Sequence, residues 1–377
     1  MNRPRLLALR ALGLGDLLTG LPALRALRDG FPAHELVLAA PRALAPLAVA
    51  SEAVDSVSDV HGIDAAALAG RLPAGPWDLA VNLHGRGPQS SRALLALGPR
   101  RLVAWACPQA GVDGPVWRCD EHEVSRWCRL LSEVGIPADA SRIDLKLPVE
   151  PTGPVDPTGP VGRVPERLVG ATVIHPGAAA PSRRWPARRW GLVAAAEAAS
   201  GRRVLVTGSS AEAPLVAAVI VASAGLMRRS GVGSAQQVGV PAATQPPDKP
   251  ASAHEGAYQD AHRDISGVDR LVGADVMTLA AHVAVAGRVV CGDTGVAHLA
   301  TALRRPSVVL FGPTSPARWG PPPERRQHVA LWAGRTGDPH AERPDPGLLA
   351  ISVSDVLAAL DGLPAAPPPV VVASGPG

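Results

Sequence analysis

Short apolar runs alternate with longer segments of helical periodicity along most of the chain. In the first half, three runs predict strands: RLLALR, HELVLAA and WDLAVNL. The segment LPALRALRDG between the first two predicts a helix. After residue 165 the alternation restarts, with apolar runs such as LVGATVIHPG, RVLVTG, RVVCGD and SVVLFGPT separated by helical patterns. Such alternation indicates parallel sheets covered on both faces. It therefore predicts an α/β protein of two doubly wound, Rossmann-like domains that face each other across a cleft.

Three segments interrupt this alternation and suggest the domain boundaries. Five prolines lie between Pro148 and Pro160, so residues 148–166 predict a semi-rigid linker. We expect an N-terminal domain at 1–147 and a C-terminal domain at 167–362. Residues 228–264 are polar, rich in Pro, Ala and Gly, and without a period, which favours a disordered insertion over a lid. The tail, 363–377, is also expected to be disordered.

Charge and composition exclude several classes of protein. The 377 residues carry a formal net charge of +4, and only 3% are aromatic. Nucleic-acid grooves usually combine basic clusters with stacking rings, so nucleic acid is not an expected partner. Nearly all basic residues are arginines, which suit a small phosphorylated ligand. Without a long uncharged apolar run or a signal peptide, the chain is expected to be cytoplasmic.

The cysteines do not predict a metal centre. Four cysteines are scattered along the chain, which argues against a disulfide framework. Cys119, His122 and Cys128 lack a fourth ligand at a usual spacing, and their segment has the pattern of one amphipathic helix. We therefore expect no metal.

The first Gly-rich turn presents one acid, Asp16, within GLGDLLTG. Its glycines are spaced one residue too widely for the usual dinucleotide motif, and the strand ending VLAAPR lacks the acid that would bind a ribose. Two interpretations remain open from the residues. Asp16 could cap the following helix, or it could act as a general base on an acceptor hydroxyl.

A second turn, CGDTGVAHL, predicts an anion site in the other half. A buried strand ends at Cys291, and a helix is expected to start at Asp293 or Thr294, with Asp293 as its N-cap. The N–H groups of Thr294, Gly295 and Val296 would then face a pyrophosphate. One turn further, His298 could donate to the same group, although an isolated helical histidine is more often structural.

Two further segments could contact a nucleotide. In HPGAAAPSRRWPARRW, Ser182 and Arg183 follow a predicted strand and could hold phosphates, or they could belong to a solvated basic loop beside packed tryptophans. Glu212, in VLVTGSSAE, could hold a ribose diol or simply complement a helix dipole.

Taken together, these segments resemble glycosyltransferase family 9, the lipopolysaccharide heptosyltransferase-like enzymes. The resemblance runs from residue 5 to about residue 320, and its most specific part is CGDTGVAHLATALRRPSVVLFGPTSPARWGP. It implies a GT-B fold, with the acceptor bound mainly by the first domain and a nucleotide sugar by the second. It also implies inverting transfer, with no cofactor besides the nucleotide-sugar co-substrate and no required metal.

The resemblance also implies roles for individual residues. Asp16 matches the proposed base, Glu212 lies near the nucleotide-ribose acid, and Arg183 lies where relatives have a basic residue at the donor phosphates. Asp293, Thr294, Gly295 and His298 match the phosphate-binding helix start, with Val296 beside them. The acceptor side would include Gly15 and, in the turn HGRGPQS, His84, Arg86 and Gln89.

We therefore expect transfer of a heptose-like sugar from an ADP-linked donor to a glycan or glycolipid acceptor. Because such acceptors are often membrane lipids, peripheral contact with the inner face of the membrane is compatible with this expectation. Two alternatives remain open: a catalytically silent nucleotide-sugar-binding protein of the same fold, and an NAD(P)-dependent oxidoreductase, which the missing ribose acid disfavours.

Overall fold

The structure is a computed structural model that describes residues 3–63, 68, 70–73, 76–147, 164–229 and 267–368. Most of the expected linker, insertion and tail (148–163, 230–264 and 369–377) lies outside the described residues. At the start of the expected insertion, residues 228 and 229 are the last two residues of a helix.

The N-terminal part forms one parallel sheet with the strand order β3-β2-β1-β4-β5. Its strands are β1 (Arg5–Leu9), β2 (Glu35–Ala40), β3 (Ser56–Asp59), β4 (Leu79–Asn82) and β5 (Leu102–Val103). Its helices are α1 (Leu14–Gly30), α2 (Ala45–Ala50), α4 (Gln89–Leu95) and α5 (Glu123–Ser132). The central strand β1 is almost entirely buried, as expected for an apolar run between helix layers.

The C-terminal part repeats this plan with a six-stranded parallel sheet in the order β11-β10-β9-β6-β7-β8. Its strands are β6 (Thr172–His175), β7 (Val204–Gly208), β8 (Val268–Val272), β9 (Arg288–Gly292), β10 (Ser307–Phe311) and β11 (His328–Trp332). Its helices are α6 (Ala187–Ala199), α7 (Ala213–Arg229), α9 (Val276–Ala284), α10 (Gly295–Ala302), α11 (Pro316–Trp319), α12 (Pro346–Ala350) and α13 (Val353–Asp361).

Both sheets have the strand order of doubly wound folds, so the predicted architecture is confirmed. In such sheets, ligands bind beyond the carboxyl ends of the strands, at the point where the strand order reverses. Here the reversal falls between β1 and β4 in the first sheet and between β6 and β9 in the second. Asp16 lies in the first turn of α1, the helix that follows β1, and Asp293 follows β9 directly. The topology alone therefore places both predicted turns where a ligand belongs.

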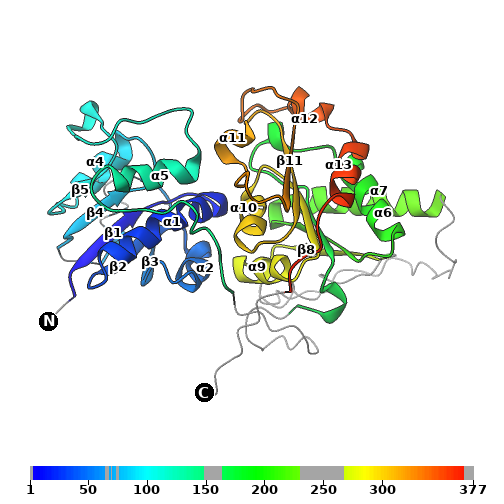
Figure 1. The fold of residues 1–377 in the computed structure, drawn as a ribbon, viewed down its shortest axis with the longest axis horizontal. Coiled ribbons are helices and arrows are strands. Elements are labelled where there is room, and N and C mark those ends of the chain that lie inside the picture. Colours follow the sequence, from blue (N-terminus) through cyan, green and yellow to red (C-terminus); the bar gives the residue numbers. More distant parts are fainter. Residues whose placement is uncertain are drawn as a thin grey trace, which may run out of the picture.

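The two domains pack directly against each other through α1 and α10, which lie side by side where the domains meet (Figure 1). A Cβ atom on Gly295 would lie 2.9 Å from Leu14 Cβ and 3.0 Å from the nitrogen of Gly15. A Cβ on Gly15 would lie 2.9 Å from His298 Cδ2. Glycine is therefore needed at both positions, because the N-terminal turns of the two helices approach each other closely.

A second set of contacts joins the domains further along the chain. Asp144 pairs with Arg304 at 2.9 Å and with Arg325 at 2.6 Å, both from the C-terminal domain. Beside them, the Leu145 amide donates to the carbonyl of Ala302 at 2.8 Å. These bonds fix the segment after α5 against the end of α10.

Candidate functional site

Asp16 lies in the first turn of α1, where its side chain is 27% exposed. The N-cap is Gly13, whose backbone N–H donates to Asp16 Oδ2 at 3.3 Å. The carboxylate thus does support the helix start, as one interpretation of the sequence held. It also lines a cleft, so this contact and a chemical role coexist. Burial raises the pKa of Asp16, while the Arg10 guanidinium at 3.6 Å acts to lower it.

Arg10, which the sequence analysis missed, is a buried residue beside Asp16 that bonds to several neighbouring elements. It follows β1 directly, its side chain is completely buried, and its guanidinium stacks on the Trp127 ring with 4.9 Å to the ring centroid. It donates to the carbonyls of Asp16 and Leu83, and to Thr19 Oγ1 at 2.9 Å. A charged residue at the end of an apolar central strand was the available signal, but its partners come from elements far apart in the sequence.

Glu123, at the start of α5, completes this buried network. Its Oε1 lies 3.5 Å from Arg10 Nη2 and accepts from Trp127 Nε1 at 2.7 Å. Its other oxygen accepts from Arg126. Two cations and two carboxylates therefore lie close together, with Asp16 at the solvent-facing end.

The acceptor-side residues expected after β4 are only partly brought together. His84 is half-buried, and both burial and the neighbouring Arg10 lower its pKa. Arg86 and Gln89 are exposed. Neither lines the cavity at Asp16, the cavity at Glu212 or a third cavity at His122. Their roles at an acceptor stay predictions.

At the second turn, the structure corrects the expected helix start. The N-cap of α10 is Thr294, not Asp293, and its hydroxyl accepts from the Val296 N–H at 3.1 Å. That N–H is therefore already bonded within the protein. Asp293 instead is buried and precedes the cap, because the extended strand continues through Gly292 and the helix starts one residue later than expected. Burial raises the pKa of Asp293 to about 6, although Arg183 acts to lower it.

Arg183 reaches the cleft from a short 3₁₀ helix, Pro181–Arg183. Its Nη1 lies 3.3 Å from the Asp293 carbonyl and 3.9 Å from the Asp293 carboxylate. Its Nε is buried and has no hydrogen-bond partner among the described residues. The side chain as a whole is 23% exposed, so another part of it could meet an anionic ligand in the cleft.

The neighbours of Arg183 have structural contacts. Ser182 is almost fully buried and donates its hydroxyl to the Pro339 carbonyl at 2.8 Å, so it supports the loop that carries Arg183. Its contact with phosphate stays a prediction. Trp185 and Trp190 pack edge to face in the core, with ring centroids 5.0 Å apart. They serve packing, as the alternative interpretation of this segment held.

Glu212 ends the 3₁₀ helix Ser210–Glu212 and accepts from both the N–H and the hydroxyl of Ser209, each at 2.9 Å. It also lines a cavity of about 260 Å³ together with His175 and Thr207. His175, another residue missed by the sequence analysis, has a pKa lowered by burial, and its Nδ1 lies 3.0 Å from Thr207 Oγ1. Glu212 therefore both caps its helix and faces a space that could hold a ligand.

A cavity of about 460 Å³ lies between the two domains at the N-termini of α1 and α10. It is lined by Asp16, Arg183, Asp293, Thr294 and His298, together with Arg318, Trp319 and His340, which the sequence analysis did not single out. This cavity shares Leu14, Ala179, Thr294 and Gly295 with the cavity beside Glu212. The two cavities therefore adjoin each other at the start of α10.

His298 forms one wall of this cleft, with its ring edge to face with Trp319 at 5.9 Å. Burial, reinforced by His122 and Arg10, lowers its pKa to about 4. The imidazole is therefore neutral near pH 7, and one ring nitrogen can donate a hydrogen bond to a ligand.

Comparisons with known proteins show a family match over part of the chain and similar folds over nearly all of it. The family model of glycosyltransferase family 9 (heptosyltransferase) matches residues 271–347, the segment that includes the α10 turn. The resemblance to this family is thereby confirmed for the part of the chain with the most specific motif. A comparison with curated protein sequences gives no match.

Solved structures similar to this one cover nearly the whole chain. E. coli ADP-heptose LPS heptosyltransferase II is 17% identical, with a TM-score of 0.65 over 95% of this chain and 97% of that one. The glycosyl transferase family 9 structure from Veillonella parvula DSM 2008 is also 17% identical, with a TM-score of 0.66 and coverages of 96% and 97%. E. coli heptosyltransferase WaaC with ADP is 19% identical, with a TM-score of 0.59 and coverages of 95% and 99%. The likeness shows that this chain has the GT-B fold.

Proposed function

We propose that this protein is an inverting glycosyltransferase. It transfers a heptose-like sugar from an ADP-linked nucleotide sugar to a hydroxyl of a glycan or glycolipid. The observation that carries the proposal is the shared cavity, in which the Asp16 carboxylate of one domain faces Arg183 and the α10 N-terminus of the other. The family-9 match over the α10 turn and the GT-B relatives, one of them holding ADP, support the same assignment.

In the proposed reaction, Asp16 accepts the proton of the acceptor hydroxyl. The hydroxyl oxygen then forms a bond to C1 of the sugar from the face opposite the nucleotide. The C1–O bond to the diphosphate breaks, and its electron pair leaves with the nucleoside diphosphate. A base of raised pKa accepts a proton more readily than an ordinary aspartate, so the partial burial of Asp16 favours this role.

The second domain would stabilise the leaving diphosphate. The partial positive charge at the start of α10 and the guanidinium of Arg183 face the cavity, and His298 can add a neutral donor. The ribose would lie in the adjoining cavity, within reach of Glu212. Among the described residues, no group of three or more His, Cys, Asp or Glu side chains could hold a metal ion. We propose that the α10 N-terminus and the Arg183 guanidinium stabilise the leaving diphosphate in place of a metal ion.

Membrane contact remains part of the proposal because the acceptor is unidentified. No helix among the described residues is long and apolar enough to cross a bilayer. A glycolipid acceptor would therefore be met at the surface of the membrane, with the enzyme working at its cytoplasmic face.

Two variants test the division of roles between the domains. Asp16→Asn should reduce turnover by roughly 10²–10⁴ and leave the Kd for ADP unchanged, because the amide is no base. Arg183→Ala should raise the Kd for ADP roughly tenfold or more and lower turnover as well, because it removes a charge-assisted hydrogen bond.

Arg188→Ala is the matched control for Arg183, since Arg188 is an exposed arginine on α6 that lines none of the three cavities. ADP binding is measured by calorimetry, and transfer is measured by release of ADP from ADP-heptose. Near-normal turnover in Asp16→Asn would rule out the base assignment. Binding of ADP without any transfer by the native protein would favour the silent binding protein.

A further inference from the structure

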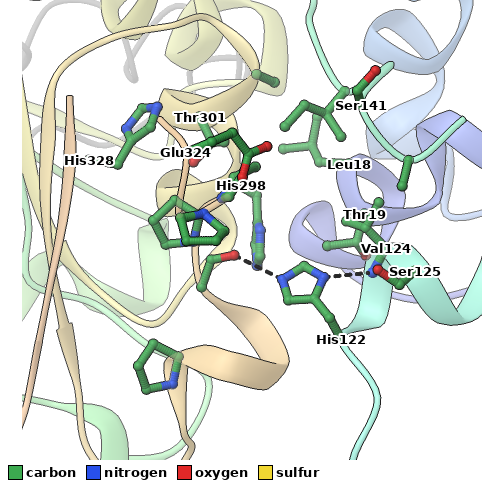
Figure 2. Close-up of a pocket in the computed structure, with 18 of the residues that line it drawn as sticks. Leu18, Thr19, His122, Val124, Ser125, Ser141, His298, Thr301, Glu324 and His328 are labelled. Atoms are coloured by element: carbon green, nitrogen blue, oxygen red, sulfur yellow. Dashed lines mark hydrogen bonds between the residues drawn. The ribbon is translucent and has the colours of Figure 1, made fainter. Parts of the chain in front are cut away.

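A third and larger cavity, of about 820 Å³, lies between the domains on the other side of His298 from Asp16. Figure 2 shows Leu18 and Val124 on the side of the N-terminal domain, and Thr301 and Glu324 on the side of the C-terminal domain. His122 closes one end by bonding across the domain boundary to the carbonyl of Gly320 at 2.9 Å. The volume lies within the range of sites that bind compact organic molecules.

The walls of this cavity are mostly carbon and carry no cation. Ile143 and Ala302 line it from opposite domains, and Pro321, Pro322 and Pro323 follow each other along one wall. Among the described residues that line it there is neither arginine nor lysine, and Glu324 is the sole acid. Burial lowers the pKa values of the lining residues His298 and His328 to about 4, so neither is a cation near pH 7. A phosphate or carboxylate placed here would lose hydration without gaining an arginine or lysine partner. The cavity therefore favours a neutral, largely apolar body.

One histidine in the wall of this cavity has a buried ring nitrogen without a partner among the described residues. His328 lines the cavity and is only 8% exposed, and its Nδ1 is bonded to Ser307 Oγ at 2.8 Å. Its Nε2 is buried and has no hydrogen-bond partner among the described residues.

The cavity borders the one that Asp16 lines. His298 lines both spaces, and Thr19 lines the larger one from the same face of α1 as Asp16, one turn further along. Thr19 Oγ1 lies 3.1 Å from the Asp16 carbonyl. A molecule that fills the cavity would therefore extend to within about one helical turn of the proposed base.

We propose that this cavity, between α1, α5 and α10, binds the neutral, apolar part of the acceptor, while the hydroxyl to be glycosylated faces Asp16. This inference rests on the proposed function. It narrows the class of acceptor to molecules that have a compact, uncharged, apolar part. Because the cavity walls come from both domains, such an acceptor also bridges them.

Direct binding of two probes, measured by calorimetry with ADP present, tests the inference. 2-Naphthyl β-D-glucoside is neutral, and 2-naphthyl phosphate carries the same ring with a charge. We expect saturable binding of the glucoside and at least tenfold weaker binding of the phosphate. Ser125→Trp, at an exposed lining position of α5, should weaken glucoside binding at least tenfold by filling the space. Ala317→Trp, from the opposite wall, should do the same.

Ser132→Trp is the matched control, because Ser132 is an exposed serine of the same helix that does not line the cavity. It should bind the glucoside like the native protein. Equal binding by Ser125→Trp and Ala317→Trp, or phosphate binding as strong as that of the glucoside, would overturn the inference. So would native protein that binds ADP but not the glucoside. Absence of ADP binding would instead overturn the proposed donor site.

Discussion

At the scale of single residues, the environment of Asp16 depends on a cation that the chain buries completely. Burial raises the pKa of Asp16 and Arg10 opposes that effect, so the resulting basicity is a balance between them. Arg10 also contacts Glu123 and Thr19, and it therefore holds the helix that carries the proposed base. It acts as a positioning residue, because its side chain has no exposure to a substrate.

Arg10→Met should show this balance in the pH profile of transfer. Removing the cation leaves Asp16 and Glu123 without their shared partner, so the pKa of Asp16 should rise further. The base is active only when ionised, so turnover falls as the pH falls through this pKa, and the acid limb of the profile should move to higher pH. Arg10→Lys, which keeps the charge, should shift the limb less.

Stability should fall in Arg10→Met by about 3–5 kcal/mol, the usual cost of breaking a buried pair. Urea unfolding measures this loss, whereas the pH profile reports the effect on Asp16. A limb that stays in place in both Arg10 variants would leave Arg10 with a purely structural role.

Asp293 gives a second pH prediction, this time for stability. Its pKa is raised from 3.8 to about 6 by burial, so the folded protein binds this proton more tightly than the unfolded chain does. The contribution of Asp293 to the free energy of unfolding should therefore increase as the pH falls from above 6 towards 4. Asp293→Asn should lose this component. Urea titrations of both proteins at pH 5 and pH 7 measure it, and an unchanged pH dependence in the variant would contradict the assignment.

Sequence reasoning reached part of this residue-level arrangement. It found Asp16, Arg183, Thr294 and Glu212, because each follows the end of an apolar strand. It missed Arg10 and His175, because Glu123 beside Arg10 and Thr207 beside His175 come from elements far apart in the sequence. The N-cap was misplaced by one residue, because aspartate and threonine are both good caps and the sequence does not show where the strand ends.

At the scale of elements, the apolar runs predicted the central strands well. Strands buried on both faces need continuous apolar sequence, and β1, β2, β4, β6, β7, β9 and β10 have it. The edge strands β3 and β11 and the two-residue β5 were not identified. Ser56–Asp59, for example, reads SVSD, because an edge strand with half-exposed side chains does not need an apolar run.

The contact between α1 and α10 depends on glycine and can be tested by adding one methyl group. Gly295→Ala would place Cβ 2.9 Å from Leu14 Cβ and 3.0 Å from a backbone nitrogen, neither of which can turn away. We expect a loss of about 1–3 kcal/mol in unfolding free energy, together with weaker ADP binding. Gly225→Ala, in α7, is the control because its Cβ would meet no atom within 4 Å.

That control should be stabilised by roughly 0.5–1 kcal/mol through helix propensity alone. Thermal or urea unfolding of the two variants gives the comparison. Equal stability of Gly295→Ala and the native protein would mean that the helices can separate without cost.

At the scale of the whole molecule, two sets of contacts join the domains in addition to the bond between His122 and the Gly320 carbonyl. The first is the α1–α10 contact, and the second is Asp144 with Arg304 and Arg325. Asp144→Ala should lower the unfolding free energy by about 1 kcal/mol at low salt, with a smaller effect at high salt, because two of the three side chains are partly exposed.

Asp361→Ala, an exposed acid at the end of α13, is the matched control and should change little. Urea unfolding at two salt concentrations provides the measurement. A salt-independent loss in Asp144→Ala would indicate that packing, and not charge, joins the domains there.

The close contact of α1 and α10 has an electrostatic consequence. Both helices present their N-terminal ends, each with a partial positive charge, to the same point. Like charges held together repel, a cost that the Asp16 carboxylate in the first turn of α1 reduces. A bound diphosphate would act as the counter-ion between the two helix ends. Donor binding and domain docking are then thermodynamically linked, and each strengthens the other by the same factor.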